Sequence, residues 1–252
     1  MKLCVVNSSG GLDSSTLMRK ALDEGFKILP INYNYGQKNI VEMSAQKQIV
    51  NQFKKQFPDM IMDTIVIDFT QTFGDAIKTF QNNRDSGKTE DEIGMKYYMP
   101  SRNLLFMSTS AVIGEILALD ENIKEIYLGL GIHKHSDIYE RDYWDISPEF
   151  AEKLQDLLSL NDSTSVKVYA PYKDSFKSKI IEDMVKFNIP YRLTWTCYDP
   201  VISYNEKIEL NLATPCKVCE ACLERSTQAN NVVEGFGEII NDYTLEVSFN
   251  NF

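Results

Sequence analysis

The chain has 252 residues, of which 43% are apolar, and its formal net charge at pH 7 is −10. This length is enough for one large domain with a core of its own, with or without a small appendage. The acidic balance argues against direct binding of nucleic acid, whose phosphates it repels. No apolar stretch has the length that a bilayer requires, and the N-terminal segment MKLCVVNSSGG is typical of a first strand, so we expect a cytoplasmic protein without a membrane segment.

Short apolar runs alternate with amphipathic segments over the first three quarters of the chain. The runs that we expect to be buried strands are residues 3–7, 27–33, 61–67, 124–130 and 165–169. The segments with helical periodicity are residues 14–24, 40–56, 102–119, 147–159 and 177–187. This alternation predicts an α/β fold with a mostly parallel sheet and helices on both faces. Residues 102–119 are apolar nearly all round and are expected to be buried.

Two regions interrupt this alternation. Residues 81–96 are polar and contain glycine, which is typical of a surface loop. Residues 197–222 hold four cysteines around a run with no clear period. We therefore expect an α/β domain at 1–190, followed at 191–252 by a metal-binding segment that ends in a short helix and one strand.

The first expected strand leads into a turn of small residues, SGGLDS, and then directly into a helix. In an open parallel sheet such a turn is an anion site, because its N–H groups and the helix dipole face the ligand. Gly10 and Gly11 allow close backbone approach, and Ser9, Ser14 and Ser15 add hydroxyl groups. The turn lacks the lysine of a Walker loop and the spaced glycines of a Rossmann fingerprint. It matches the SGGxDS loop of ATP pyrophosphatases; an ordinary capped turn is the alternative.

Four of the five cysteines are clustered. Cys216, Cys219 and Cys222 form a CxxCxxC motif, and Cys197 precedes it. An odd count in a large chain argues against a disulfide framework. Four thiolates suit a closed, structural zinc site, although an iron–sulfur cluster takes the same set. Cys4 is expected to be a small core residue.

Six segments, in chain order, together resemble the 7-cyano-7-deazaguanine synthase (QueC) family. They are SSGGLDSS near the start, INYNYGQK at 31–38, YYMPSRNLLFMS at 97–108, SPEF at 147–150, SKIIEDMVKFNIPYRLTWTCY at 178–198 and PCKVCEACLER at 215–225. The resemblance implies a Rossmann-like ATP pyrophosphatase (PP-loop) fold. It also implies that ATP adenylates 7-carboxy-7-deazaguanine, that ammonia displaces AMP to give the amide, and that a second activation dehydrates the amide to the nitrile. Mg²⁺ with ATP, Zn²⁺ on the four cysteines and a homodimer are implied as well.

The resemblance assigns the expected residues to roles. The pyrophosphate would be held by Ser9, Gly10, Gly11, Leu12, Asp13 and Ser14. Asp13 either places Mg²⁺ or caps the helix. Arg102 is a bidentate donor suited to a carboxylate or phosphate, with a surface arginine before a helix as the alternative. Lys179 either reaches a phosphate as a point charge or is a solvated helix lysine. Asp13, Arg102 and Lys179 are the expected catalytic residues. His133 and His135 are expected to be loop residues rather than metal ligands.

Two further groups of residues are expected to meet the purine rings. Tyr35 and Gln37 follow the second strand, where the adenine or ribose of ATP would lie. Asp137, Tyr143 and Asp145 precede SPEF, and there an aromatic ring could stack on a deazapurine while carboxylates accept its N–H groups. The alternatives are an ordinary turn and a packed loop.

Two stretches depart from the family pattern: residues 129–147, and the 19-residue step from Cys197 to Cys216. These departures leave a second hypothesis open: the chain is a divergent relative that activates the same acid but stops at the amide or conjugates the acid to another amine. A nucleotide-binding partner without turnover is a third possibility, against which the intact loop and cysteine set count. A tRNA thiolase or lysidine-type ligase has the same loop, but the net charge of −10 counts against a tRNA substrate.

Overall fold

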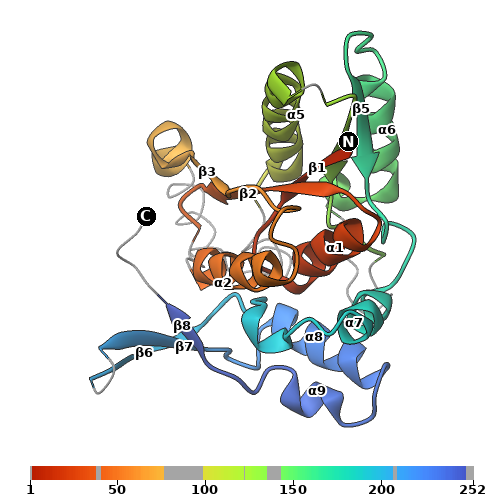
Figure 1. The fold of residues 1–252 in the computed structure, drawn as a ribbon. Coiled ribbons are helices and arrows are strands. Elements are labelled where there is room, and N and C mark those ends of the chain that lie inside the picture. Colours follow the sequence, from red (N-terminus) through yellow and green to blue (C-terminus); the bar gives the residue numbers. More distant parts are fainter. Residues whose placement is uncertain are drawn as a thin grey trace.

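The computed structural model describes residues 2–37, 41–76, 99–121, 123–134, 143–206 and 209–247, without the side chains of residues 120 and 121. The predicted loop at 81–96 lies outside these ranges. Helices cover both faces of a central sheet, and a smaller sheet with its own helices lies beyond one helical layer (Figure 1). The predicted α/β architecture is confirmed.

The central sheet has five parallel strands in the order β3-β2-β1-β4-β5. Their bounds are Lys2–Asn7 (β1), Lys27–Asn34 (β2), Ile65–Asp68 (β3), Glu125–Gly129 (β4) and Ser165–Tyr169 (β5). Strand β1 is central, with Cys4 opposite Ile28 of β2 and Tyr127 of β4. The chain runs from β1 to one side of the sheet and later crosses to the other. The carboxyl end of β1 is therefore the switch point at which open α/β sheets bind ligands.

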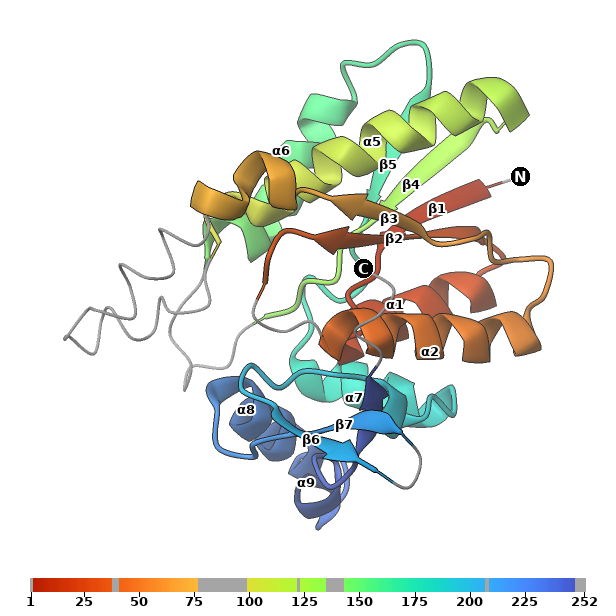
Figure 2. The same ribbon diagram turned by 90° about the vertical axis from the view of Figure 1, so that its left-hand side faces the viewer.

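Helices α1 and α2 cover one face of the sheet, α7 packs against α1, and α5 and α6 cover the other face (Figure 2). Their bounds are Leu12–Asp23 (α1), Val41–Gln56 (α2), Arg102–Glu121 (α5), Pro148–Leu158 (α6) and Lys177–Lys186 (α7). Successive side chains of β1 enter opposite cores, with Val6 on the α1 side and Val5 on the α5 side. The five predicted strands and five predicted helices are all present, although β3 begins at Ile65, later than expected.

Helix α5 is not buried all round, and that prediction is wrong. Val112, Ile116 and Leu119 are 58%, 55% and 81% exposed. The sheet covers only the side of α5 that packs on β1 and β4. By length and composition Arg102–Leu119 could cross a membrane, a test that the core helices of soluble proteins also pass.

The C-terminal segment folds into an antiparallel sheet of order β6-β7-β8 with two helices. The bounds are Val201–Asn205 (β6), Leu210–Thr214 (β7), Glu220–Asn230 (α8), Phe236–Ile239 (α9) and Leu245–Val247 (β8). The final helix and strand agree with the sequence prediction. The β6–β7 hairpin occupies the run without a clear period. Its first strand is mostly exposed, so it lacks the alternation that marks a half-buried strand.

Buried side chains join this segment to the main sheet domain. Val41 and Ala45 of α2 pack with Trp195 and Leu245. The fully buried Trp195 also donates its backbone N–H to the carbonyl oxygen of Gly10, at 2.9 Å, in the turn after β1. The C-terminal segment is therefore in direct contact with the SGGLDS turn, and a domain boundary near residue 190 stays a prediction.

Gly10 is where the turn presses most closely on a neighbouring helix. Its φ angle is +82°, and a Cβ there would lie 2.6 Å from the carbonyl oxygen of Glu42 and nearer still to the backbone nitrogen of Gln46. Both atoms belong to the backbone of α2, which cannot move aside locally. Glycine is therefore required at this position for packing as well as for conformation.

We expect Gly10→Ala to destabilise the protein more than Gly25→Ala. Gly25 has the same φ of +82°, but a methyl group added there would meet nothing within 4 Å, so its alanine variant tests conformational strain alone. That strain costs about 1–2 kcal/mol, and the backbone clash at Gly10 adds about 1–3 kcal/mol. Denaturant unfolding of both variants measures the difference; equal losses would contradict this account of Gly10.

Candidate functional site

A cavity of about 250 Å³ lies at the carboxyl ends of β1, β2 and β4. Its wall combines the turn after β1, the end of β2, the first residues of α2, α5 and α7, and two parts of the C-terminal segment. The cavity therefore occupies the switch point of the sheet and is closed on one side by the cysteine-bearing segment.

The SGGLDS turn forms one wall of this cavity. The structure brings Ser9, Gly11, Leu12, Asp13 and Ser14 to the cavity, whereas Gly10 packs on α2. The hydroxyl oxygen of Ser9 accepts the N–H of Gly11 at 3.1 Å and lies 3.2 Å from the hydroxyl of Ser14. Helix α1 begins after Gly11, and no side chain caps its first N–H groups. These N–H groups, at the positive end of the helix dipole, therefore stay available to an anion in the cavity.

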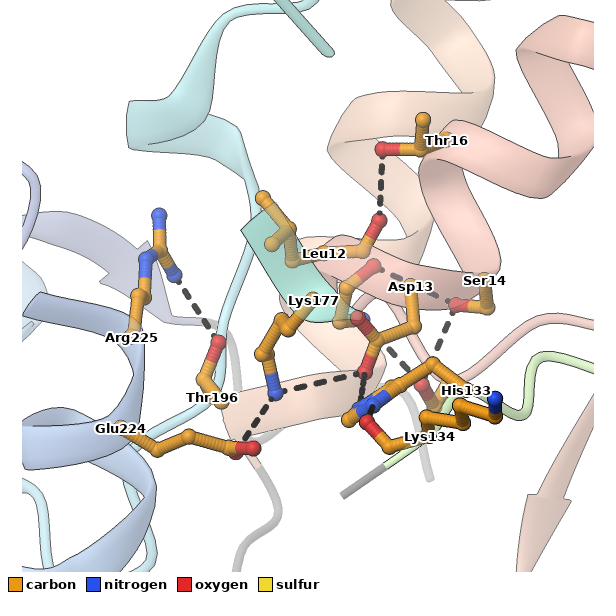
Figure 3. A network of polar contacts seen from close by, with 12 residues as sticks. Leu12, Asp13, Ser14, Thr16, His133, Lys134, Lys177, Thr196, Glu224 and Arg225 are labelled. Atoms are coloured by element: carbon orange, nitrogen blue, oxygen red, sulfur yellow. Dashed lines mark hydrogen bonds and ion pairs between the residues drawn. The ribbon is translucent and has the colours of Figure 1, made fainter. Parts of the chain in front are cut away.

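Asp13 has the features of a ligand for a cation. Its Oδ2 atom lies 3.6 Å from Nζ of Lys177 and 4.0 Å from Nε2 of His133 (Figure 3). Its Oδ1 atom is buried and has no hydrogen-bond partner among the described residues. Burial acts to raise the pKa of Asp13, but Lys177 and His133 outweigh it, so the pKa lies below its usual value. Because Gly11 is the N-cap of α1, Asp13 does not cap the helix.

Lys177, rather than Lys179, reaches the cavity, which corrects the sequence prediction. Nζ of Lys179 lies 3.1 Å from Glu182 and 2.9 Å from Asp183, and its side chain is 50% exposed. Lys177 is 5% exposed and lines the cavity. Two residues along a helix differ by about 200° in direction, so only one of the two lysines can face the turn.

The charge of Lys177 is stabilised by its neighbours. Burial acts to lower the pKa of Lys177, but Asp13 and Glu224 outweigh it and raise the pKa above its usual value. The ionised Asp13 stabilises the folded protein at any pH above the pKa of aspartate in the unfolded chain. This contribution is lost as the pH falls through the lower pKa that Asp13 has in the folded protein. The protonated Lys177 stabilises the folded protein at any pH below the pKa of lysine in the unfolded chain. This contribution is lost only as the pH rises through the higher pKa that Lys177 has in the folded protein. Both groups therefore remain charged between about pH 5 and pH 9.

Arg102, Tyr35 and Gln37 meet at the opposite wall. Arg102 is the first residue of α5, and its Nη1 atom donates to the hydroxyl of Tyr35 at 3.4 Å. Gln37 accepts the N–H of Tyr35 at 2.9 Å and donates to the carbonyl of Tyr33 at 3.0 Å, which fixes the turn after β2. All three predicted residues line the same cavity.

Asp145 has a different role from the predicted one. It is 2% exposed, and its carboxylate accepts the backbone N–H of Asn103 at 3.0 Å, at the start of α5. Its carbonyl oxygen accepts the side-chain amide of the same Asn103 at 3.0 Å. The carboxylate therefore anchors α5 instead of facing the cavity. Tyr143 is half-buried and Asp137 lies outside the described residues.

Several cavity residues escape prediction from the sequence. Those that line the cavity are Ser8, Asn32, Glu42, Lys177, Tyr198 and Glu224, and His133 lies beside it, 4.0 Å from Asp13. The oxygen atoms Ser8 Oγ and Asn32 Oδ1 are buried without a hydrogen-bond partner in the described part of the chain. One signal was available: Asn32 is a polar residue in the otherwise apolar run ILPINY. An unsatisfied buried acceptor at a cavity is a position where a ligand can donate.

The four clustered cysteines converge as their spacing predicts. The Sγ atoms of Cys197, Cys216, Cys219 and Cys222 all lie within 4.8 Å of one another. The backbone N–H of Cys216 donates to the sulfur of Cys197 at 3.2 Å, and that of Cys219 to the sulfur of Cys216 at 3.3 Å. Cys4 is fully buried on β1, away from this cluster, and burial raises the pKa of its thiol. The cluster is a candidate metal centre.

A protein-family model described as queuosine biosynthesis protein QueC matches residues 3–233. The chain belongs to the QueC family. Among similar curated proteins is the 7-cyano-7-deazaguanine synthase of Pseudoalteromonas translucida, which is 28% identical over 91% of this chain and 95% of its own length. The 7-cyano-7-deazaguanine synthase 2 of Colwellia psychrerythraea is 30% identical over 92% of this chain and 96% of its own length. This QueC-family chain therefore spans nearly the full length of these relatives.

Similar solved structures are more distant from this QueC-family chain. A U34-tRNA thiolase from Methanococcus maripaludis, with a [4Fe-4S] cluster, is 12% identical over 96% of this chain and 70% of its own length, with a TM-score of 0.42. A 4-thiouridine synthetase in complex with RNA and ATP is 15% identical over 73% of this chain and 40% of its own length, with a TM-score of 0.38. Both likenesses are too weak to bear on the activity of this chain.

We expect Lys177→Met to weaken the binding of magnesium pyrophosphate and Lys179→Met to leave it unchanged. Loss of a buried cation beside the SGGLDS turn costs about tenfold or more in affinity. The matched variant removes a lysine from the exposed side of the same helix. Isothermal titration calorimetry compares the two variants; a larger loss in Lys179→Met would restore the original assignment.

Proposed function

We propose that the chain is a 7-cyano-7-deazaguanine synthase, an ATP-dependent ligase that forms carbon–nitrogen bonds. The substrates would be 7-carboxy-7-deazaguanine and ammonia. The observation that carries this proposal is the SGGLDS turn, with Asp13 and Lys177 beside it, at the switch point of a QueC-family chain. Relatives that match nearly the whole chain bear that enzyme name.

The proposed reaction has two activations. In the first, the substrate carboxylate attacks the α-phosphorus of ATP and pyrophosphate leaves; ammonia then attacks the acyl carbon, AMP leaves and a proton is released, which gives the amide. In the second, the amide oxygen attacks another ATP, pyrophosphate leaves again and the amide nitrogen releases a proton; loss of AMP and of the second N–H proton then gives the nitrile. Both activations need positioned phosphates and neutralised charge more than acid–base chemistry.

The residues of the SGGLDS wall would hold the triphosphate. Ser9, Gly11, Leu12 and Ser14 line the cavity at the positive end of α1, and Gly10 would shape the turn from behind. The buried, unpartnered Oδ1 atom of Asp13 fits a ligand for Mg²⁺, which neutralises phosphate charge when bound. Lys177 would contact a phosphate as a point charge.

The remaining cavity residues would receive the two ring systems and the substrate carboxylate. Tyr35 and Gln37 are proposed to adjoin the adenosine of ATP, and Arg102 to bind a carboxylate or phosphate. Asp145 is engaged at α5, and Asp13 and Glu224 both contact Lys177. Glu42 is a further carboxylate of the cavity wall.

Isotope-labelled substrate tests the reaction. Purified protein is incubated with Mg²⁺, ATP, ammonium and acid labelled with heavy oxygen in its carboxyl group, and the products are analysed by mass spectrometry. We expect nitrile product and AMP in a ratio of one to two, with one heavy oxygen in each AMP. Amide without nitrile, or an acyl conjugate formed only with another amine, would support the alternative enzyme. Absence of AMP would contradict both.

We propose zinc as the metal of the cysteine cluster. Four sulfur atoms bound to one tetrahedral zinc at ~2.3 Å lie ~3.8 Å apart, which is compatible with Sγ atoms all within 4.8 Å. In an iron–sulfur cluster the four cysteines are shared among two or four irons instead of one metal ion, which spreads the sulfur atoms further apart. With four sulfur ligands no position is left for water, so the role would be structural.

Metal analysis checks this assignment. We expect one zinc per chain in wild-type protein and in Cys4→Ala, and its loss in Cys219→Ser, because Cys219 belongs to the cluster and Cys4 does not. The lost ion should also lower the thermal midpoint, since structural zinc contributes directly to folding. Iron and labile sulfide in place of zinc would overturn the proposal.

The remaining expectations are proposals that follow from the family resemblance and composition. We propose a homodimer that acts in the cytoplasm on small molecules, without direct contact with nucleic acid. The net charge of −10 supports the last point.

A further inference from the structure

Lys177 contacts carboxylates from two distant parts of the chain. Its Nζ atom lies 3.0 Å from Oε2 of Glu224 on α8 and 3.6 Å from Oδ2 of Asp13 on α1 (Figure 3). The side chains of Lys177 and Glu224 are only 6% and 13% exposed. A buried ammonium needs such partners, and the closer of the two comes from the C-terminal segment.

Glu224 has no direct role in the proposed reaction, yet its carboxylate contacts Lys177, the lysine that would bind a phosphate of ATP. A lysine has a flexible four-carbon stem, so a single partner does not define the position of its ammonium. With Asp13 alone, the ammonium would move onto that carboxylate, and each group would neutralise the other. Contact with Glu224 on the far side holds Lys177 away from Asp13, which keeps Asp13 available to a cation and Lys177 available to a phosphate.

Helix α8 holds Glu224 firmly relative to the SGGLDS turn. The neighbouring Arg225 is fully buried and donates to the carbonyl oxygens of Thr194 at 3.1 Å and Tyr191 at 3.0 Å. This arginine thereby fastens α8 to the segment that contains Trp195, whose N–H donates to Gly10. The same helix begins after Cys219 and carries Cys222 in its first turn, so the cysteine cluster anchors its amino end.

We propose that Glu224 is a positioning residue for ATP cleavage: through its contact with Lys177 it sets the place of that ammonium beside Asp13. This inference rests on the proposed function for its reaction, but the contact itself concerns the binding of ATP. It makes the C-terminal segment a working part of the nucleotide site, in addition to its structural role.

A double-mutant cycle on the binding of Mg·ATP tests the proposal without the deazaguanine acid. We expect Glu224→Gln and Lys177→Met each to weaken binding about tenfold, and the double variant to bind no more weakly than Lys177→Met alone. The reason is that Glu224 would act only through Lys177. In Lys177→Met the carboxylate of Glu224 is unpaired and repels the phosphates of ATP, so Glu224→Gln in that background removes the repulsion. Additive losses, or wild-type affinity in Glu224→Gln, would overturn the proposal.

Three controls separate positioning from a general structural effect. Glu182→Gln breaks an exposed lysine–glutamate contact of 3.1 Å on α7 and should leave ATP binding unchanged. Glu224→Asp keeps the charge and should bind ATP more tightly than Glu224→Gln; equal loss in both would contradict the proposed role of the charge. The zinc content of Glu224→Gln should match the wild type, and a loss of zinc that accounts for weaker binding would also overturn the proposal.

The reaction gives a second, independent reading. In ATP–pyrophosphate exchange with the acid, Glu224→Gln should lower kcat and raise KM for ATP while KM for the acid stays within about twofold. A change confined to KM for the acid would show that Glu224 contacts that substrate instead, and would overturn the positioning role. If wild-type protein binds ATP but does not exchange pyrophosphate with this acid, the proposed function fails, whereas the binding cycle still decides the role of Glu224.

Discussion

The arrangement of the site depends on one buried positive charge. Lys177 is nearly inaccessible to water, so its ammonium requires opposite charges close by, and these come from Asp13 and Glu224. The three residues belong to α7, α1 and α8, which are far apart in sequence. Neutralising this single group therefore requires the turn after β1, the helix after β5 and the cysteine-bearing segment to meet at one cavity.

Backbone contacts support the same arrangement. Gly10 touches α2 so closely that no side chain fits, and its carbonyl oxygen accepts the N–H of Trp195. Arg225 in turn donates to carbonyl oxygens of the segment that leads into that tryptophan. The SGGLDS turn is thus held between α2 and the C-terminal segment, which suits a loop that must present N–H groups to phosphates without rearrangement.

Much of this could be predicted from local sequence. The strand and helix periods, the SGGLDS turn and the CxxCxxC spacing each depend on residues close together in the chain, and the structure agrees with them. The prediction of Lys179 failed for a simple reason. The periodicity of apolar residues identifies a helix, but it does not show which of two nearby lysines faces a residue of another helix. The assignment of Asp145 to a substrate failed for a similar reason, since the N–H of Asn103 that it accepts lies 42 residues away.

The sequence by itself determined the α/β class, the family and the presence of an anion-binding turn and a cysteine cluster. Each of these depends on patterns among residues that are close together in the chain. Only the tertiary structure decided which charges meet. Glu224 gives no signal in the sequence, since one acidic residue on a mostly polar helix resembles any solvated one. Its significance arises when folding removes water from around Lys177, because a contact that would contribute little at the surface becomes a condition for burying the charge.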